Sequence, residues 1–537
     1  MFTRNFLLLV AFIGTACTNG AGQPAPDTGQ PPSDGSTDAA LNEDTGAAAA
    51  DTASAEDRPV DPDTNRKADV GGVSCQVNFS IPSQPVDGGV VPAVAAGAGL
   101  PAHITGVFPA PGATEVCADA QLRIAFAGPT KAGKAGKILV WQTTGPDGGT
   151  PVVVDSLDLA DGGYTKQVGG KSFFYWPVVF EGSVATIILH APLPIGGTYA
   201  VTVDDGVFID TAGAPLPGIA DDSLWTFSTT TTAPSVKPAL TVALDGTGDT
   251  CTIQGAIDLV PVGNTTPIEI TLKAGTYREI VYAASKRFVT LRGEDREKSI
   301  IAYANNENCN KGTASRALVT LAASSDWVIE NLTIANQAPL LSSNAQAEAL
   351  HVEASRIIVR NANLFSNQDT LLLNGLVYIA DSLIKGNVDY VWGTGTAYFE
   401  RCELRTVARA GYTVQARNPA TSYGYVFVDC KLTAESPNMT GHYLARTNFS
   451  DPSGAPACHV AFVNCQMGSH IDPKGWLVAV GSVDNSQVRF WEYQSTDPTG
   501  APVDVSQRIL ESKQLDDASA AEMRDATVVL KGWNPRS

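Results

Sequence analysis

Two aspartates that occupy equal places in a repeated pattern are the side chains of this sequence best arranged for chemistry. Asp369 lies ten residues after Val359, and Asp389 lies ten residues after Ile379. If each repeat forms one coil of about 20 residues, the two carboxyl groups stack on one face, roughly 4.8 Å apart. Two carboxylates that close do not both ionise readily, so the pair offers one nucleophile or base and one proton donor. The alternative is a pair of solvated aspartates at turns.

The element that must position these aspartates is a six-residue pattern, apolar-x-polar-small-x-apolar. Its six copies start 30, 20, 20, 28 and 35 residues apart, at Ile329, Val359, Ile379, Phe399, Phe427 and Phe462. Such a period is typical of a solenoid, and a spacing of 20 suits one coil of a right-handed parallel β-helix. Longer spacings indicate loops inserted at turns. Three copies carry a cysteine that would stack inside, namely Cys402, Cys430 and Cys465. A disulfide between two of them is geometrically allowed, although an unbonded ladder is favoured.

Residues 100–232 show a different pattern. Short alternating strands such as 122–126, 137–141, 185–189 and 199–203 are separated by Gly and Pro turns, which is typical of a β-sandwich. The stretches 108–113, 193–199 and 210–227 resemble bacterial Ig-like modules of extracellular proteins. We find no catalytic constellation there, so a spacer or adhesion role is expected. The predicted fold is therefore mostly β, with an N-terminal Ig-like β-sandwich domain followed, from residue 236 to 537, by the parallel β-helix.

The N-terminal region predicts export. A positive residue, an apolar stretch over 6–13 and the sequence Gly14-Thr15-Ala16-Cys17 indicate a signal peptide over 1–17 with lipidation of Cys17; an ordinary signal peptide is the alternative. Residues 18–99 are predicted to be a disordered acidic linker, with 71–99 left open between linker and sandwich. The expected location is the outer membrane or cell surface as a lipoprotein, or secretion, and any membrane contact is through the lipid only.

Charge and cysteine content exclude some functions. The chain has a net charge of −19, whereas nucleic-acid binding needs basic patches. Residues 18–70 hold 11 acidic and 3 basic residues, which places −8 of that charge in the linker. Eight cysteines remain besides Cys17, an even number that permits disulfides in an exported protein. No CxxC pair or His/Cys cluster predicts a metal site.

Six ordered motifs between about 240 and 535 resemble the pectin methylesterases (pectinesterases), a family of carbohydrate esterases. The motifs are Ala274–Glu279, Gln346–Leu350, Asn367–Leu371, Gly386–Gly393, Tyr412–Arg417 and Tyr443–Arg446. The resemblance implies a carboxylic ester hydrolase that converts methyl-esterified homogalacturonan to pectate and methanol. No cofactor is implied, because the nucleophile is a carboxylate and the oxyanion donors are amides. A monomer is expected.

The resemblance also implies a role for each matching residue. Asp389 would be the nucleophile, and Asp369 would be the acid and then the base. Gln346 and Gln368 would donate hydrogen bonds to the oxyanion, and Arg446 would pair with Asp389. Four further residues would bind substrate: Tyr390 and Trp392 through their rings, and Gln415 and Arg417 unless these two are structural.

Departures from the family pattern keep two other functions open. The usual Arg-Pro-Trp run is replaced by Arg446-Thr447-Asn448. Losing that aromatic residue leaves open an esterase or thioesterase of the same fold that acts on another ester. Glu348 and His351 stand where an apolar and a basic residue are expected. The negative charge of Glu348 near the cleft predicts a preference for highly methylated substrate. A non-catalytic glycan-binding surface protein is the third hypothesis, which the complete set of catalytic residues disfavours.

Overall fold

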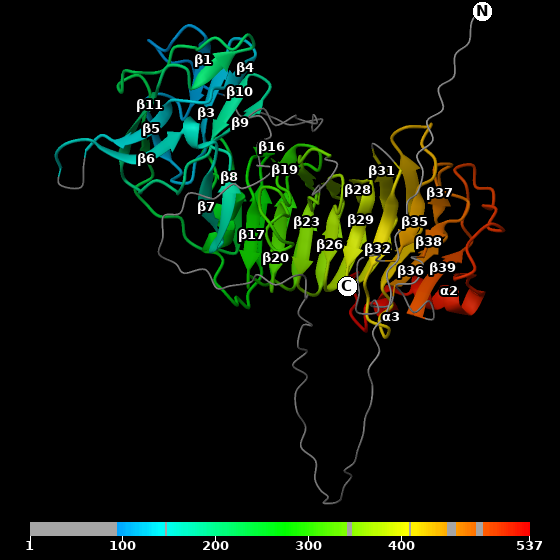
Figure 1. Ribbon diagram of the computed structural model, residues 1–537. Helices are drawn as coiled ribbons and strands as arrows, with labels where there is room; N and C mark the ends of the chain where they lie inside the picture. Colours follow the sequence, from blue (N-terminus) through cyan, green and yellow to red (C-terminus); the bar gives the residue numbers. More distant parts are fainter. Residues whose placement is uncertain are drawn as a thin grey trace, which may run out of the picture. The chain divides into compact units, whose positions relative to one another are not determined.

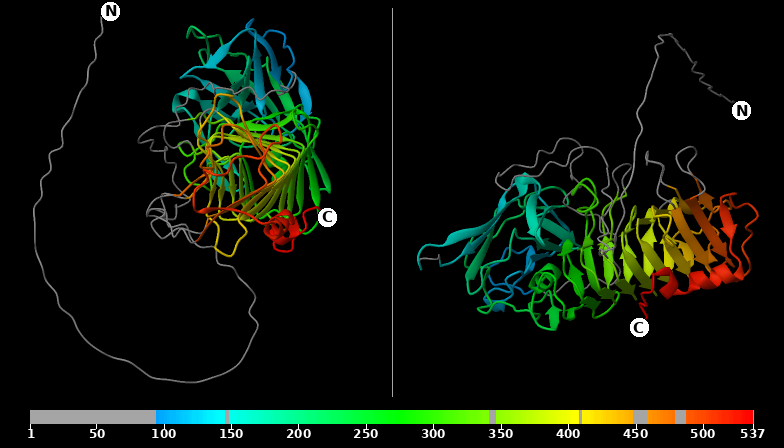
Figure 2. Two further views of the ribbon diagram at one scale, coloured as in Figure 1. Left: turned by 90° about the vertical axis from the view of Figure 1, so that its right-hand side faces the viewer. Right: turned by 90° about the horizontal axis from the view of Figure 1, so that it is seen from below.

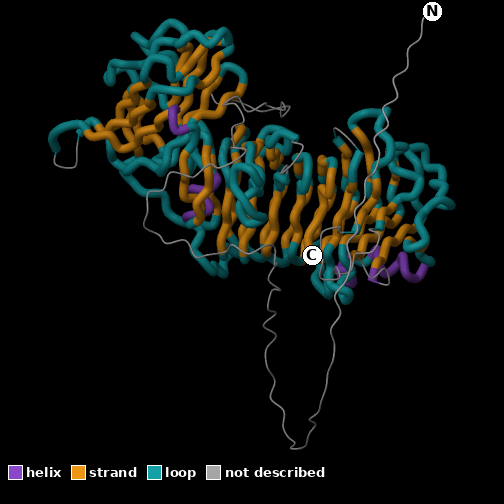
Figure 3. The backbone as a smooth tube through the Cα atoms, in the orientation of Figure 1, coloured by secondary structure: helices purple, strands orange, loops and turns teal. Residues whose placement is uncertain are grey.

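The computed structural model describes residues 94–144, 148–340, 346–407, 410–447, 458–478 and 487–536. Strands dominate these ranges, and helices are few and short (Figure 3). The predicted signal peptide, Cys17, the acidic linker up to residue 93 and Asn448 lie outside the described residues. Within the described ranges, no helix combines the length and the apolar character needed to cross a membrane.

Three parallel sheets form the C-terminal part of the chain (Figure 1). A complete coil of the chain contributes one strand to each of the three sheets. The first sheet contains β14 (Ala239–Val242), β15 (Ile268–Leu272), β18 (Val289–Gly293), β21 (Trp327–Glu330), β24 (Ile357–Arg360), β27 (Leu376–Ala380), β30 (Thr396–Glu400), β33 (Tyr425–Val428), β36 (Cys458–Val463), β39 (Val488–Tyr493) and β40 (Ser512–Gln514). The second contains β16 (Gly275–Tyr277), β19 (Ser299–Tyr303), β22 (Thr333–Asn336), β25 (Asn363–Phe365), β28 (Leu383–Gly386), β31 (Glu403–Thr406), β34 (Lys431–Ala434) and β37 (Gln466–Met467). The third contains β17 (Val281–Ala284), β20 (Val319–Ala322), β23 (Leu350–Glu353), β26 (Leu371–Leu373), β29 (Val388–Gly393), β32 (Tyr412–Ala416), β35 (Tyr443–Arg446) and β38 (Trp476–Leu477). The predicted parallel β-helix is confirmed, and Figure 2 (left) shows the strands of successive coils lying behind one another.

The six-residue repeat marks the turn between the first and second sheets. Its first residues pair in register from coil to coil, as Val359 with Ile379 and Ile379 with Phe399. Its third residue always has a positive φ, between 48° and 56°, at Asn331, Asn361, Asp381, Arg401, Asp429 and Asn464. Asn and Asp tolerate this left-handed conformation better than most residues. The polar third position of the repeat therefore follows from the geometry of a short turn.

The apolar positions of the repeat stack in the interior. The rings of Phe399, Phe427 and Phe462 form a continuous stack with centroids 4.3 and 4.6 Å apart. The three cysteines are buried beside them without a disulfide, so the predicted ladder of unbonded thiols is confirmed. A fourth buried free thiol belongs to Cys458. Like residues stack because parallel, in-register strands place equal positions one strand spacing apart.

Antiparallel sheets form the N-terminal part. One contains β1 (Ile104–Phe108), β3 (Leu122–Phe126), β10 (Val184–Ile187) and β9 (Val178–Glu181), and the other contains β2 (Ala113–Val116), β13 (Thr226–Thr229), β11 (Thr198–Val203), β5 (Lys137–Gln142) and β6 (Val152–Asp158); only the contact of β2 with β13 is parallel. A small sheet joins β12 (Phe208–Asp210) to β4 (Thr130–Ala132). Their apolar faces share one core around the fully buried Trp225.

Apolar packing, a disulfide and hydrogen bonds connect the sandwich to the β-helix. The hairpin of β7 (Tyr164–Val168) and β8 (Lys171–Tyr175) buries Phe173 and Tyr175 in the β-helix core. A disulfide joins Cys117 to Cys251, two residues 134 positions apart. Beside it, the Asp119 carboxylate accepts hydrogen bonds from the backbone N–H groups of Cys251 and Thr252.

Short helices complete the fold. α1 (Ile253–Leu259) is N-capped by Thr252 and buries Ile253, Ala256 and Ile257 in the β-helix core. η1 (Leu159–Asp161) lies in the sandwich. α2 (Asp517–Arg524) and α3 (Ala526–Val529) pack on the outer face of the first sheet through an apolar cluster that includes Tyr398 and Val426.

Candidate active site

Asp369 and Asp389 meet on the third sheet. Asp369 lies two residues before the start of β26, and Asp389 is the second residue of β29. Leu371 pairs with Val391, so the two aspartates, each two residues earlier, hold the same register on adjacent coils. The N–H of Asp369 donates to the Val388 carbonyl (3.0 Å) and fixes the two coils at this point. The stacking that the 20-residue spacing predicted is therefore present.

Both aspartates have unusual backbone conformations. Their φ angles are +66° for Asp369 and +48° for Asp389, in the left-handed region. A β-branched or bulky residue would be strained there, whereas Asp is tolerated. Sparsely populated backbone conformations cost free energy and cluster at functional sites.

Asp389 is held from two sides. From β35, the Arg446 guanidinium donates to both of its carboxylate oxygens, with Nε 2.8 Å from Oδ1 and Nη2 on Oδ2. From β32, Gln415 Nε2 donates to Oδ2 (3.0 Å). The Gln415 amide is itself fixed, because its oxygen accepts from Arg417 Nε (2.9 Å) and Nη2 (2.7 Å). Bidentate pairing with arginine orients a carboxylate and favours its ionised form.

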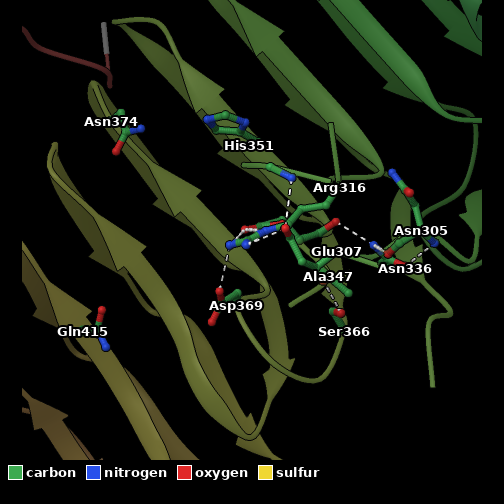
Figure 4. A network of polar contacts seen from close by, with 12 residues as sticks. Asn305, Glu307, Arg316, Asn336, Ala347, His351, Ser366, Asp369, Asn374 and Gln415 are labelled. Atoms are coloured by element: carbon green, nitrogen blue, oxygen red, sulfur yellow. Dashed lines mark hydrogen bonds and ion pairs between the residues drawn. The ribbon is translucent and has the colours of Figure 1, made fainter. Parts of the chain in front are cut away.

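Asp369 has a different set of neighbours. It accepts one hydrogen bond from Arg316 Nη2 (3.0 Å), and the same nitrogen donates to Glu348 Oε1 (2.8 Å). Arg316 also donates through Nε to both Glu348 oxygens and through Nη1 to Glu307. Figure 4 shows Arg316 together with Glu307 and Asp369. One guanidinium thus serves three acidic groups.

The environments act on the acidity of the two carboxyl groups. Burial raises the pKa of Asp369 well above its usual range, and the charge of Glu348 raises it further while Arg316 opposes the rise. Burial also raises the pKa of Asp389, but the hydrogen bonds and charge of Arg446 act against it. The pair can therefore hold one proton, with Asp369 as its holder.

The two glutamines predicted to bind an oxyanion lie next to this pair. Gln346 and Gln368 form a β-bridge, and Gln368 bridges in turn to Val388. Both residues are partly exposed. The side-chain oxygen of Gln346 is buried and makes no hydrogen bond within the described ranges. Gln368 thus directly precedes Asp369, and the bridge places Gln346 beside Gln368 on the adjacent coil.

Among the residues predicted to bind substrate, Tyr390 is not accessible to a sugar ring. Its side chain is fully buried in the β-helix core, and its hydroxyl lies 3.3 Å from Thr413 Oγ1. Strict alternation would place Tyr390 and Trp392 on the same face of β29. The pairing of β29 with β32 is irregular between Val388 and Val391, so alternation is broken where Tyr390 enters the core. Trp392 is 7% exposed and lies between two guanidinium groups, 4.9 Å from Arg417 and 5.6 Å from Arg316. Gln415 is 3% exposed and contacts Asp389, which makes it a support for that carboxylate.

The structure corrects the expectation for Glu348 and adds residues that sequence reasoning missed. Glu348 is completely buried and bound to Arg316, so it does not present a charge to the cleft. Arg316 belongs to none of the motifs, and only the unexpected charge at Glu348 signalled that a buried cation was needed. The Tyr412 ring lies 4.8 Å from the Arg446 guanidinium and stacks on Tyr443, with ring centroids 5.8 Å apart. Tyr412 belongs to the motif that contains the predicted substrate-binding residues Gln415 and Arg417.

One group of side chains in the described ranges has the spacing of metal ligands. It consists of Cys117, Asp119 and Cys251. Its two sulfur atoms form the disulfide, so neither is a thiolate that could bind an ion.

Comparisons with known proteins agree with this geometry. Residues 239–528 match the Pectinesterase family, and residues 100–229 match a bacterial Ig-like domain. The chain is 32% identical over 292 residues to Pectinesterase 31 of Arabidopsis thaliana, which covers 52% of this chain and 88% of that protein. It is 31% identical over 300 residues to Pectinesterase 2 of Olea europaea, covering 54% and 78%. The solved pectin methylesterase from carrot shares the fold, with a TM-score of 0.50 at 21% identity over 56% of this chain and 95% of that one.

These findings define a carboxylic ester hydrolase built on a parallel β-helix. The chain belongs to the pectinesterase family and carries a bacterial Ig-like domain before its family domain. Both domains indicate an extracellular protein.

Proposed function

We propose that this protein hydrolyses the methyl esters of homogalacturonan, releasing methanol and pectate, with Asp389 as nucleophile and Asp369 as acid and base. The observation that carries the proposal is the contrast between two adjacent buried carboxyl groups. Asp389 has a bidentate arginine and a glutamine, which favour a carboxylate. Asp369 shares one arginine with two glutamates, which favours a carboxylic acid.

The reaction has two halves. A carboxylate oxygen of Asp389 attacks the ester carbonyl carbon, and the carbonyl oxygen becomes an oxyanion that Gln346 and Gln368 stabilise by hydrogen bonds. The C–OCH₃ bond then breaks, and Asp369 gives its proton to the departing methoxide, which leaves as methanol. In the second half, Asp369 takes a proton from water. The hydroxide attacks the acyl-enzyme, and Asp389 leaves as a carboxylate.

Arg446 and Gln415 hold the nucleophile for this attack. Both bind Asp389 in the resting enzyme, so its oxygens are oriented before substrate arrives. The partly exposed rings of Tyr412 and Tyr443, stacked beside Arg446, offer apolar faces to sugar rings.

The test is methanol release from highly methylated pectin by the intact protein and by Asp389→Asn. The wild type should release methanol, and the variant, which keeps the shape of the side chain, should not. Release by neither protein, with both folded, would refute the pectin substrate. Equal release by both would refute Asp389 as the nucleophile. Asp429→Asn is a matched control, because Asp429 is an exposed aspartate with a similar φ of +53° on another turn of the β-helix.

A further inference from the structure

A third carboxylate stands in the column of the two aspartates. Leu350, Leu371 and Val391 pair in register on three consecutive coils. The residues two positions before them are Glu348, Asp369 and Asp389. The pairing shifts by one residue between Gln346–Gln368 and Leu350–Leu371, but Arg316 Nη2 binds both Glu348 and Asp369 and so holds their carboxylates side by side. Asp369 is therefore the middle one of three acidic residues. All three are buried, with exposures of 0%, 7% and 4%.

The two outer carboxylates each have an arginine. Glu348 receives Nε and Nη2 of Arg316, and Asp389 receives Nε and Nη2 of Arg446. Asp369 receives a single hydrogen bond, from a nitrogen of Arg316 that Glu348 also uses. In the cluster around Arg316, one positive charge faces Glu307, Glu348 and Asp369. Buried like charges at this spacing are not all ionised together, and the member with the weakest compensation is the one that keeps a proton.

We infer that Arg316 and Glu348 form a positioning pair that keeps Asp369 in place and protonated as the proton donor of the esterase reaction. The inference rests on the proposed function of Asp369. Glu348 engages most of the hydrogen-bonding capacity of Arg316, so that Arg316 orients Asp369 without neutralising it as a full ion-pair partner. Neither Glu348 nor Arg316 is placed to act on substrate, because Glu348 is fully buried and all three guanidinium nitrogens of Arg316 already donate to carboxylates.

Four charged groups act on the protonation of Asp369. Glu348 and Asp389 favour its protonated form, and Arg316 and Arg417 oppose it. Removing the charge of Glu348 takes away a like charge and releases Arg316 toward Asp369. Both effects favour the carboxylate of Asp369, so the acid is lost at a lower pH.

The experiment is the pH profile of kcat/KM for methanol release by the full chain, comparing wild type with Glu348→Gln. We expect the alkaline limb to move to lower pH, with about a tenfold loss of kcat at the alkaline end and an unchanged KM. The matched control is Glu492→Gln. Glu492 is also a buried glutamate, 1% exposed, and its carboxylate accepts two hydrogen bonds from Arg508 and one from Ser495, away from both aspartates. A Glu348→Gln profile that superimposes on those of the wild type and Glu492→Gln would overturn the inference.

A second variant covers the case in which Glu348→Gln does not fold. Replacing both partners with apolar residues of similar size, Arg316→Met with Glu348→Leu, removes the pair without leaving either member as a lone buried charge. The remaining partner of Arg316, Glu307, has a side chain 25% exposed to solvent. We expect normal thermal unfolding with about a tenfold lower kcat and an altered pH profile. Wild-type kcat and pH profile in a stable double variant would show that the pair only fills space, contrary to the inference.

A readout without substrate separates this inference from the proposed function. Since the native state holds a proton on Asp369 that the unfolded chain has lost, the wild type loses stability as pH rises through the raised pKa of Asp369. Glu348→Gln should move that loss to lower pH, and the shift should vanish in an Asp369→Asn background. Its presence in a protein that releases no methanol would refute the pectin substrate alone, and its absence would refute the positioning pair.

Discussion

The coil that carries Asp369 and the coil that carries Asp389 have the same backbone arrangement, but the two aspartates have different side-chain partners. Both have 20-residue spacing to the next repeat, in-register strands and a left-handed aspartate at the same place. The difference lies in what other coils supply: Gln415 from the next coil and Arg446 from the one after it for Asp389, and an arginine already bound to glutamates for Asp369. A repeated backbone thus gives two identical side chains opposite tasks through the coils on either side.

The largest expected effect in this comparison comes from removing the proton donor. Asp369→Asn keeps the shape of the side chain but not its exchangeable acid, so we expect kcat to fall by about 10²- to 10⁴-fold. Methanol release at saturating substrate measures it. If Asp369 were a solvated turn residue like Asp429, the variant would keep nearly full kcat, as Asp429→Asn should.

A smaller effect is expected on the nucleophile side. Arg446→Lys retains the positive charge but loses the two-point contact with Asp389. We expect a loss of kcat of about 10- to 100-fold. Because Arg446 opposes the raised pKa of Asp389, weaker pairing raises that pKa further, and the acid limb of kcat/KM should move to higher pH. An acid limb that stays in place, or moves to lower pH, contradicts the pairing as the source of the nucleophile's ionisation.

The smallest effect belongs to the rim of the site. Tyr412→Ala removes a ring that stacks on Tyr443 beside Arg446. We expect KM to rise several-fold, by about 3- to 10-fold, with little change in kcat. Tyr412→Phe, which keeps the ring, is the control. A large fall in kcat with constant KM would instead show that the ring serves to hold Arg446.

The fold and the register of the aspartates could be predicted from the sequence because both are periodic. The repeat exposed the turn whose third residue needs a left-handed backbone, as at Asn361 and Asp381. The stacked cysteines followed from the same spacing. Export and lipidation of Cys17 stay predictions, since they concern residues outside the described ranges.

The expectations for Tyr390 and Glu348 differ from the structure because the surroundings of a side chain depend on the fold and not on its motif alone. The motif predicts Tyr390 as a platform for a sugar ring, but its side chain is buried in the core at a register irregularity of β29 that the motif does not reveal. Glu348 was expected to charge the cleft, but Arg316 binds it from the preceding coil. A side chain's partners on adjacent coils lie 20 to 35 residues away in sequence, and no local motif records them. The charge at Glu348 indicates that a cation is needed, but the fold is required to identify that cation as Arg316.

The register of the two aspartates has a consequence for how such a chain tolerates insertions and deletions. Between Asp369 and Asp389 the coil contains β26, β27 and β28 joined by short turns. One residue added to any of these strands would reverse the faces of every side chain after it up to the next turn. Neighbouring coils absorb extra length in loops, as the repeat spacings of 30, 28 and 35 show. Across this family, length variation should therefore be frequent in the flanking coils and rare in the one coil that separates nucleophile from acid.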